Sequence, residues 1–152
     1  MTLARYLSEK IWGPMGMEAD AGWAVDPTGQ EIAFCCFVAR LRDWARLGLM
    51  LAHDGAWNGR QIVPRQWVVD STTSDPADPW SSTRRRPRWG YGNQIWLSPS
   101  GARTFMLRGV HGQMMFIDPA SKLVLLQTAV FIPAGGPTLA EAYAVWNALL
   151  AQ

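Results

Sequence analysis

The residues that could take part in chemistry cluster in one short segment, Arg108-Gly109-Val110-His111-Gly112-Gln113. Two glycines this close together in a strand-like sequence often mark a bulge, or a place where a ligand approaches the backbone. A histidine between them can donate or accept a hydrogen bond and titrates near neutral pH. Two interpretations therefore stand: a bulged strand with a hydrogen-bonded histidine, which composition alone favours, or one wall of a binding cleft.

The 152 residues contain no complete catalytic constellation. A serine hydrolase needs a nucleophile, a base within reach and N–H donors for the oxyanion. The sequence has no Gly-x-Ser-x-Gly elbow, and no serine is followed three residues later by a lysine, the spacing that places both on one helical face. Tyr91-Gly92-Asn93 spells Tyr-x-Asn, but we interpret it as an ordinary strand sequence.

The glycine-rich segment lies within the second of three runs of β-forming residues, and turn sequences connect the runs. They are Trp89 to Leu97, Thr104 to Phe116, which Gly109 and Gly112 interrupt, and Leu123 to Phe131. Connections this short predict an antiparallel meander.

Helices are predicted on both sides of these runs. Thr2 suits the N-cap of a first helix, which Gly13-Pro14 is expected to end. A second helix covers roughly Arg40 to His53, a short third one starts at Pro64, and the last begins at Thr138 with a capping box. Helices segregated from antiparallel strands predict an α+β layered domain.

The only cysteines are the adjacent pair Cys35-Cys36, directly after a small hairpin predicted over Trp23 to Phe34. Neighbouring cysteines rarely form a disulfide, because the required geometry strains the backbone. No zinc-like spacing accompanies them, and the only histidines are His53 and His111. We therefore expect neither a disulfide at this pair, nor a metal site, nor a cofactor.

The composition and charge of the chain limit the kinds of partner that it can bind. The net charge is +2, half of the residues are hydrophobic and 17% are charged, which is typical of a globular domain. The one basic run, Arg84 to Arg88, lies in a polar segment, Ser71 to Arg88, that we interpret as a surface loop. We expect no nucleic-acid partner. No apolar run reaches the roughly 20 residues of a membrane span, so we expect a soluble chain without a membrane partner. Whether it is cytoplasmic, periplasmic or secreted depends on any preceding segment.

The order of several landmarks resembles the serine β-lactamase and penicillin-binding-protein-like hydrolases. Tyr6 to Met17 is similar to their helix followed by Pro-Leu-Gly-Met, and Ala39 to Gly48 to their Ser-x-x-Asp-hydrophobic-Ala-Arg-Phe-Gly helix. Trp89-Gly90-Tyr91-Gly92, and Gly109 to Gln113 followed by Phe116-Ile117-Asp118-Pro119, resemble later landmarks. The match runs through nearly the whole chain and is nearest to the class C-like branch of esterases, D-amino-acid peptidases and 6-aminohexanoate-dimer hydrolases.

The resemblance implies hydrolysis of an amide or ester through an acyl-serine intermediate. In this family Ser-x-x-Lys and Tyr-x-Asn precede the helix that opens this chain. The chain is therefore expected to be a C-terminal part (1–152) that lacks the nucleophile and is inactive alone. It would comprise a helical part with a small hairpin (1–70), a loop (71–88), and about three antiparallel strands of the family's sheet with a terminal helix (89–152). The alternative is a non-catalytic, degenerate or partner-completing module of the same fold, which would associate through its incomplete sheet edge.

The resemblance also assigns site residues. The family's third motif, Lys-Thr-Gly or His-x-Gly, corresponds to Arg108-Gly109-Val110, which departs from both patterns. The implied catalytic residues are Val110, whose backbone N–H would bind the oxyanion, Gly109, which would let the substrate approach, and His111. Arg108, Gly112 and Gln113 would bind the small-molecule amide or ester. Arg108 or His111 would pair with a substrate carboxylate, or hydrogen-bond the Tyr or Lys of the missing motifs.

Overall fold

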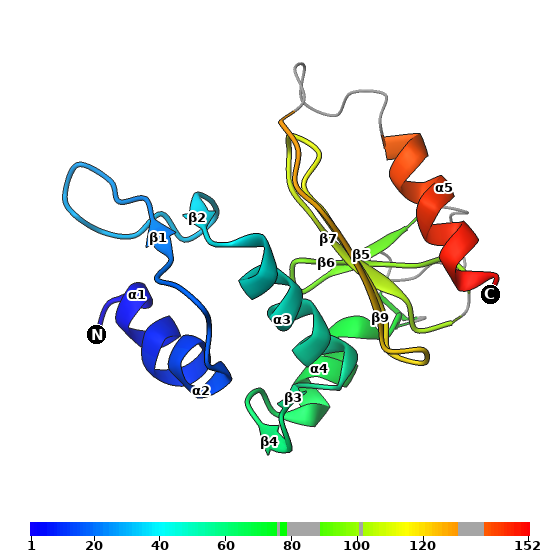
Figure 1. Ribbon diagram of the computed structural model, residues 1–152, viewed down its shortest axis with the longest axis horizontal. Helices are drawn as coiled ribbons and strands as arrows, with labels where there is room; N and C mark the ends of the chain where they lie inside the picture. The colour runs from blue at the N-terminus through cyan, green and yellow to red at the C-terminus, as the bar shows by residue number, and fades with distance from the viewer. Residues whose placement is uncertain (76, 79–88, 101, 131–138) are drawn as a thin grey trace.

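The computed structural model describes residues 1–75, 77–78, 89–100, 102–130 and 139–152 (Figure 1). Most of the loop predicted over 71–88, with its arginine run, and the predicted capping residue Thr138 lie outside these residues. Among the described residues, no helix is both long and apolar enough to cross a membrane.

A five-stranded antiparallel sheet forms the centre of the fold. Its strands follow one another in the order β5-β6-β7-β8-β9. Their bounds are Gly90–Gly92, Ile95–Leu97, Phe105–Arg108, Met114–Asp118 and Leu123–Gln127. The predicted α+β class with an antiparallel meander is confirmed, but the described residues form five strands where about three were expected. Two of the three predicted runs are hairpins.

Backbone conformation explains why these runs divide. Asn93 and Gln94 have φ angles of 50° and 65°, so they make a two-residue turn of the left-handed kind that matches the twist of a hairpin. The register then pairs Gly92 with Ile95. The second run divides at Gly109–Gln113, and Arg108 pairs with Met114 across that turn.

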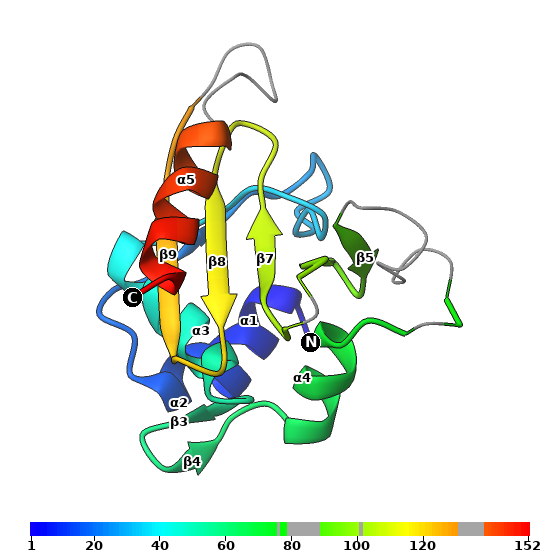
Figure 2. The same cartoon turned by 90° about the vertical axis from the view of Figure 1, so that its right-hand side faces the viewer.

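Two helices cover opposite faces of the sheet (Figures 1 and 2). Helix α3 (Leu41–Ala52), as predicted, packs on one face and α5 (Leu139–Leu150) on the other. Alternation along the strands supplies the two cores, because successive side chains point to opposite faces. Buried residues on the α3 face include Phe105, Met115 and Ile117, and those on the α5 face include Met106, Met114 and Phe116.

The N-terminal helix is longer than predicted. Segments α1 (Leu3–Leu7), η1 (Ser8–Trp12, a π-helix) and α2 (Gly13–Met15) follow without a break. The Thr2 side chain caps the start, as predicted, by accepting a hydrogen bond of 3.2 Å from the Arg5 amide. Gly13-Pro14 does not end the helix, because both residues lie in its last segment, α2, directly after the π-helical turn. Gly16 ends it, with a φ of 63°.

The remaining elements are short. Strand β1 (Gly22–Trp23) pairs with β2 (Phe37–Val38), β3 (Ala56–Trp57) pairs with β4 (Arg60–Gln61), and α4 (Arg65–Thr72) begins directly after Pro64. The hairpin predicted over residues 23–34 contains one bridge, between Val25 and Glu31, and its regular pairing lies further out.

The expectation about the cysteines was wrong, because Cys35 and Cys36 form a disulfide. The backbone at Cys36 adopts the left-handed conformation, with a φ of 70°, and so accommodates the bond between neighbours.

Candidate functional site in the β7–β8 turn

The predicted site segment is a hairpin turn, and the prediction of one bulged strand through it was wrong. Residues Gly109–Gln113 connect β7 to β8, and the Gly109 amide donates to the Gln113 carbonyl over 2.8 Å. Gly112 supplies the left-handed position that such a turn needs, with a φ of 90°. The turn lies at one end of the sheet, where it joins β7 to β8 (Figure 2).

Two glutamine side chains hold this turn in place. The Gln113 side chain accepts a hydrogen bond from the His111 amide over 3.2 Å and donates one to the Ala129 carbonyl over 3.0 Å. From strand β9, the Gln127 amide group donates to the Gly112 carbonyl over 3.0 Å. Gln113, predicted to bind substrate, thus shapes the turn, and its partner Gln127 was missed. The signal for Gln127 was a polar residue ending the apolar run Leu123–Leu126.

Gly109 is required by the packing of the turn itself. A Cβ atom at this position would overlap Oε1 of Gln113 and would lie 3.1 Å from the Gln113 Cβ. The glycine therefore lets the Gln113 side chain fold back across the turn. This contact gives Gly109 a structural role beside the substrate approach expected from sequence.

The Val110 amide is among those that the turn leaves without an acceptor in the described part of the chain. The amides of Gly109 and His111 are both occupied by Gln113. The Val110 amide donates to no atom in the part of the chain that the structure describes, and the residue is 70% exposed. A backbone N–H held rigidly at a surface turn can bind an anionic oxygen. The oxyanion role of residue 110 stays a prediction.

Arg108 and His111 have different surroundings. Arg108, exposed at the end of β7, has its guanidinium carbon 6.0 Å from the centre of the Trp96 ring. It also lies near Tyr143 of α5: burial raises the pKa of Tyr143, and the positive charge of Arg108 opposes that rise. His111 is exposed in the turn. Trp96 and Tyr143 were not predicted as neighbours of the site.

Two further sequence expectations can be placed. Tyr91 lies in β5 and Asn93 in the turn after it, where the Tyr91 hydroxyl and the Gln94 side chain hydrogen-bond over 2.9 Å. This Tyr-x-Asn is part of a hairpin turn. Among the described residues, no three His, Cys, Asp or Glu side chains come together in a way that could hold a metal ion.

The fold is that of a β-lactamase-like hydrolase, and comparison with known proteins supports this class. No protein-family profile matches the chain. Over 124 residues the chain is 27% identical to a 6-aminohexanoate-dimer hydrolase of Paenarthrobacter ureafaciens, covering 80% of this chain and 32% of that protein.

Solved structures similar to this one include the following two. A Bacillus anthracis protein named as a 6-aminohexanoate-dimer hydrolase superposes with a TM-score of 0.84 and 28% identity, over 99% of this chain and 38% of that one. A Bacteroides dorei protein of the β-lactamase type superposes with a TM-score of 0.59 at 15% identity, over 93% of this chain and 50% of that one, and shows the fold alone. The matches support a β-lactamase-fold serine hydrolase family, as the sequence predicted. The chain spans about a third of the length of the curated relative.

Proposed function

We propose that the whole protein hydrolyses an amide or an ester through an acyl-serine intermediate, and that the β7–β8 turn forms one wall of its active site. The observation that carries the proposal is the Val110 amide, which donates to no atom of the described residues. It belongs to an exposed residue in a turn that hydrogen bonds of Gln113 and Gln127 brace. A donor fixed before the reaction stabilises the oxyanion without reorganising, which is the largest single contribution in many acyl transfers. The names of the relatives favour a short linear amide as the substrate.

The nucleophile in this proposal comes from outside the 152 residues. They contain neither Ser-x-x-Lys nor a Tyr-x-Asn outside the β5–β6 turn. The serine hydroxyl would attack the substrate carbonyl, the amine or alcohol would leave with a proton from the general base, and water would then hydrolyse the acyl-serine. Val110 would bind the carbonyl oxygen in both steps, paired with the amide of that serine.

The role of the Val110 amide is tested by replacing its N–H. Val110→Pro removes the donor, and Val110→Ala keeps it while removing the same apolar side chain. We expect the proline variant of the whole gene product to lose about 10²- to 10³-fold in kcat, and the alanine variant to stay near wild type. Thermal unfolding of both variants separates this effect from loss of the fold. Equal activity of folded proline and alanine variants would remove Val110 from the site.

The class of activity is tested with a fluorophosphonate probe and three substrates. We expect the probe to label a serine of the whole gene product and to leave the isolated 152 residues unlabelled. The 6-aminohexanoate dimer, a p-nitrophenyl ester and a penicillin then separate linear amides, esters and β-lactams. A whole gene product that the probe does not label, and that cleaves none of the three, contradicts the serine hydrolase proposal.

A second candidate is a non-catalytic module that completes the sheet of another chain. The observation that favours it is the outer edge of β9, with which no strand pairs in the described part of the molecule. The edge of a strand presents unpaired N–H and C=O groups that can pair with another chain. This candidate predicts a stable complex without probe labelling of either chain, whereas the hydrolase predicts labelling of the whole gene product.

A further inference from the structure

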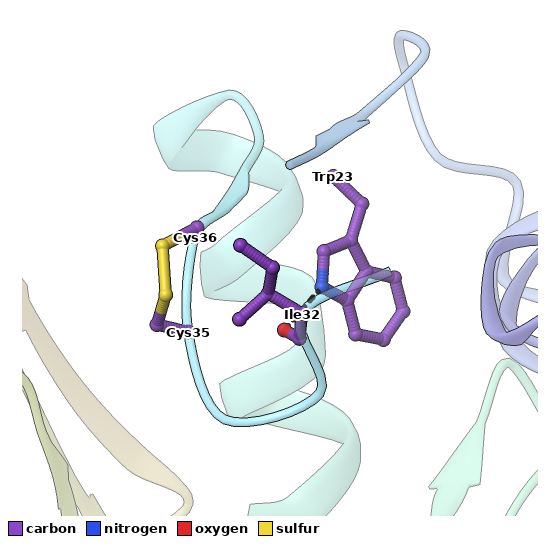
Figure 3. Close-up of a disulfide and its surroundings, with 4 residues drawn as sticks. All are labelled: Trp23, Ile32, Cys35 and Cys36. Carbon is purple, nitrogen blue, oxygen red and sulfur yellow. Dashed lines mark hydrogen bonds between the residues drawn. A yellow bond between two sulfur atoms is a disulfide. The ribbon is translucent and has the colours of Figure 1, made fainter. Parts of the chain in front are cut away.

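The disulfide between Cys35 and Cys36 lies at the surface, in the loop between β1 and β2 (Figure 3). Cys36 is exposed, Cys35 is half-buried, and the preceding residue, Phe34, is 91% exposed. Figure 3 shows the sulfur atoms on one side of the loop and the Trp23 indole on the other, with Ile32 between them. A small reductant in solution can therefore reach this disulfide without unfolding the protein.

Other disulfides stabilise a fold by lowering the entropy of the unfolded chain, but this one contributes little in that way. Its two cysteines are one residue apart, so the bond closes the smallest loop that a protein can form. The entropic stabilisation from a cross-link falls as the closed loop shortens. Its effect is therefore local, and concerns the backbone of the two cysteines themselves.

That backbone is held in a conformation which a cysteine rarely adopts. Cys36 has a φ of 70°, in the left-handed region that favours glycine. Its carbonyl accepts a hydrogen bond of 3.1 Å from the Ala24 amide, and the Cys35 amide donates to the Ile32 carbonyl over 3.3 Å. The same Ile32 carbonyl accepts from the Trp23 indole over 3.0 Å. Opening the disulfide removes one of the constraints on this backbone.

The next residue, Phe37, links this loop to the rest of the N-terminal part. Its ring makes edge-to-face contacts with the rings of Trp12, Trp23 and Trp44, with centroid distances of 5.4, 5.4 and 5.3 Å. These tryptophans belong to η1, β1 and α3. A change in the φ of Cys36 turns the chain immediately before Phe37, and so alters the surroundings of three indoles at once.

We propose that Cys35–Cys36 is a reversible thiol–disulfide exchange site that takes a dithiol reductant, and that its redox state sets the packing around Phe37. A thiolate of the dithiol attacks Sγ of the more exposed Cys36, forms a mixed disulfide, and releases the Cys35 thiolate. The second thiol of the reductant then attacks its own mixed disulfide and releases the Cys36 thiolate. Two electrons and two protons pass to the protein, and the dithiol becomes a disulfide.

The test uses a peptide that contains both cysteines. Trypsin cleaves after Lys10 and Arg40 and at no position between them, so residues 11–40 form one peptide. The native whole gene product is treated with dithiothreitol, alkylated with iodoacetamide and digested with trypsin. The mass of the peptide is then measured by mass spectrometry. We expect two alkyl groups on this peptide after native reduction and none without it, with native reduction within about tenfold of the rate in urea. Oxidised glutathione, added after removal of dithiothreitol, should restore the unalkylated peptide.

Tryptophan emission provides the second readout, and a matched variant provides the control. Dithiothreitol should shift the emission of the wild-type protein, and oxidised glutathione should reverse the shift. The Cys35→Ser/Cys36→Ser variant should show the emission of the reduced protein and no response to either reagent. Reduction only in urea, two alkyl groups without reductant, or wild-type emission that does not respond would each overturn the proposal.

Discussion

At the scale of single residues, the turn between β7 and β8 depends on one amide side chain used twice. Gln113 both accepts from the His111 amide and donates to the Ala129 carbonyl, so it ties the turn to the chain that follows β9. Gln127 adds a third bond, to Gly112. A side chain that bridges two backbone segments restricts both, and we expect this restriction to limit the motion of the neighbouring Val110 amide.

Removal of this bridge should loosen the turn more than it destabilises the fold. We expect Gln113→Ala to lower the free energy of unfolding by about 1 kcal/mol for its lost hydrogen bonds. It should also speed amide hydrogen exchange of residues 110–112 relative to β8. Gln113→Glu, which keeps an acceptor for His111 but loses the donor to Ala129, should give an intermediate exchange rate. Exchange at these amides that is unchanged in Gln113→Ala would contradict the bracing role.

The buried carboxylate of Asp43 should make the free energy of unfolding depend on pH. Asp43 is fully buried on α3, and its Oδ1 accepts from the Glu18 amide over 2.8 Å and from the Arg46 guanidinium over 2.7 Å. Burial acts to raise the pKa of Asp43, but these hydrogen bonds outweigh it and hold the pKa below its ordinary value of 3.8. A depressed pKa stabilises the fold above that value, and the contribution is lost as the pH falls through the folded-state pKa.

Asp43→Asn should therefore be less stable than wild type at pH 7, and the difference should narrow as the pH falls below about 4. Urea unfolding at several pH values measures this difference. Asp20→Asn, at an exposed residue two positions after Glu18, is the matched control and should track the wild type throughout. A stability difference for Asp43→Asn that stays constant from pH 7 to pH 3 would show that the ionised carboxylate is not what stabilises this contact.

At the scale of elements, the close approach of α3 to the sheet depends on Gly48. A Cβ atom there would lie 2.8 Å from Cγ1 of Val124 and 2.9 Å from Sδ of Met115. The methionine can turn aside, but valine is stiff at χ1. Glycine is otherwise unfavourable inside a helix by about 1 kcal/mol relative to alanine, so its presence here reflects packing.

Two opposing effects decide the outcome of Gly48→Ala. Better helix propensity adds about 1 kcal/mol, and overpacking costs about 1–3 kcal/mol. We expect a net loss of about 1 kcal/mol in the free energy of unfolding. On a Val124→Ala background the same substitution should be neutral or stabilising, because the stiff Cγ1 is gone. Equal effects on the two backgrounds, measured by urea unfolding, would rule out this contact as the cause.

The elements also show how far sequence reasoning reaches. Helix α3 and the antiparallel meander were predictable, because apolar spacing and short connections leave few alternatives. The division of two runs into hairpins was not, because Asn93-Gln94 is not a common turn pair, and Gly109 with Gly112 suits a bulge equally well. The disulfide was missed because it depends on the φ of Cys36, which the sequence does not encode directly. Which amides of the β7–β8 turn are occupied depends on the orientation of the Gln113 side chain, and the sequence does not show that orientation.

At the scale of the whole molecule, helices cover both faces of the sheet, and within the described residues its two end strands, β5 and β9, each pair on one side only. Helices α3 and α5 each bury a core against it, so the apolar side chains of β9 (Leu123–Gln127) pack to both sides. Within the described residues, β8 has neighbours on both edges and β9 has one only. Another strand can therefore join the sheet through the backbone N–H and C=O groups on the outer edge of β9. That strand can come from the same gene product or from another chain.

Amide hydrogen exchange of the isolated 152 residues tests this edge. In an antiparallel pair, alternate residues of an edge strand donate toward the neighbour, so β9 should show alternating slow and fast amides. In β8 (Met114–Asp118) all amides should be slow. In the whole gene product, a strand paired at this edge should slow the fast amides of β9 by about 10²-fold or more. Uniformly slow β9 amides in dilute monomer would mean that this edge is already covered, and would remove the basis for association there.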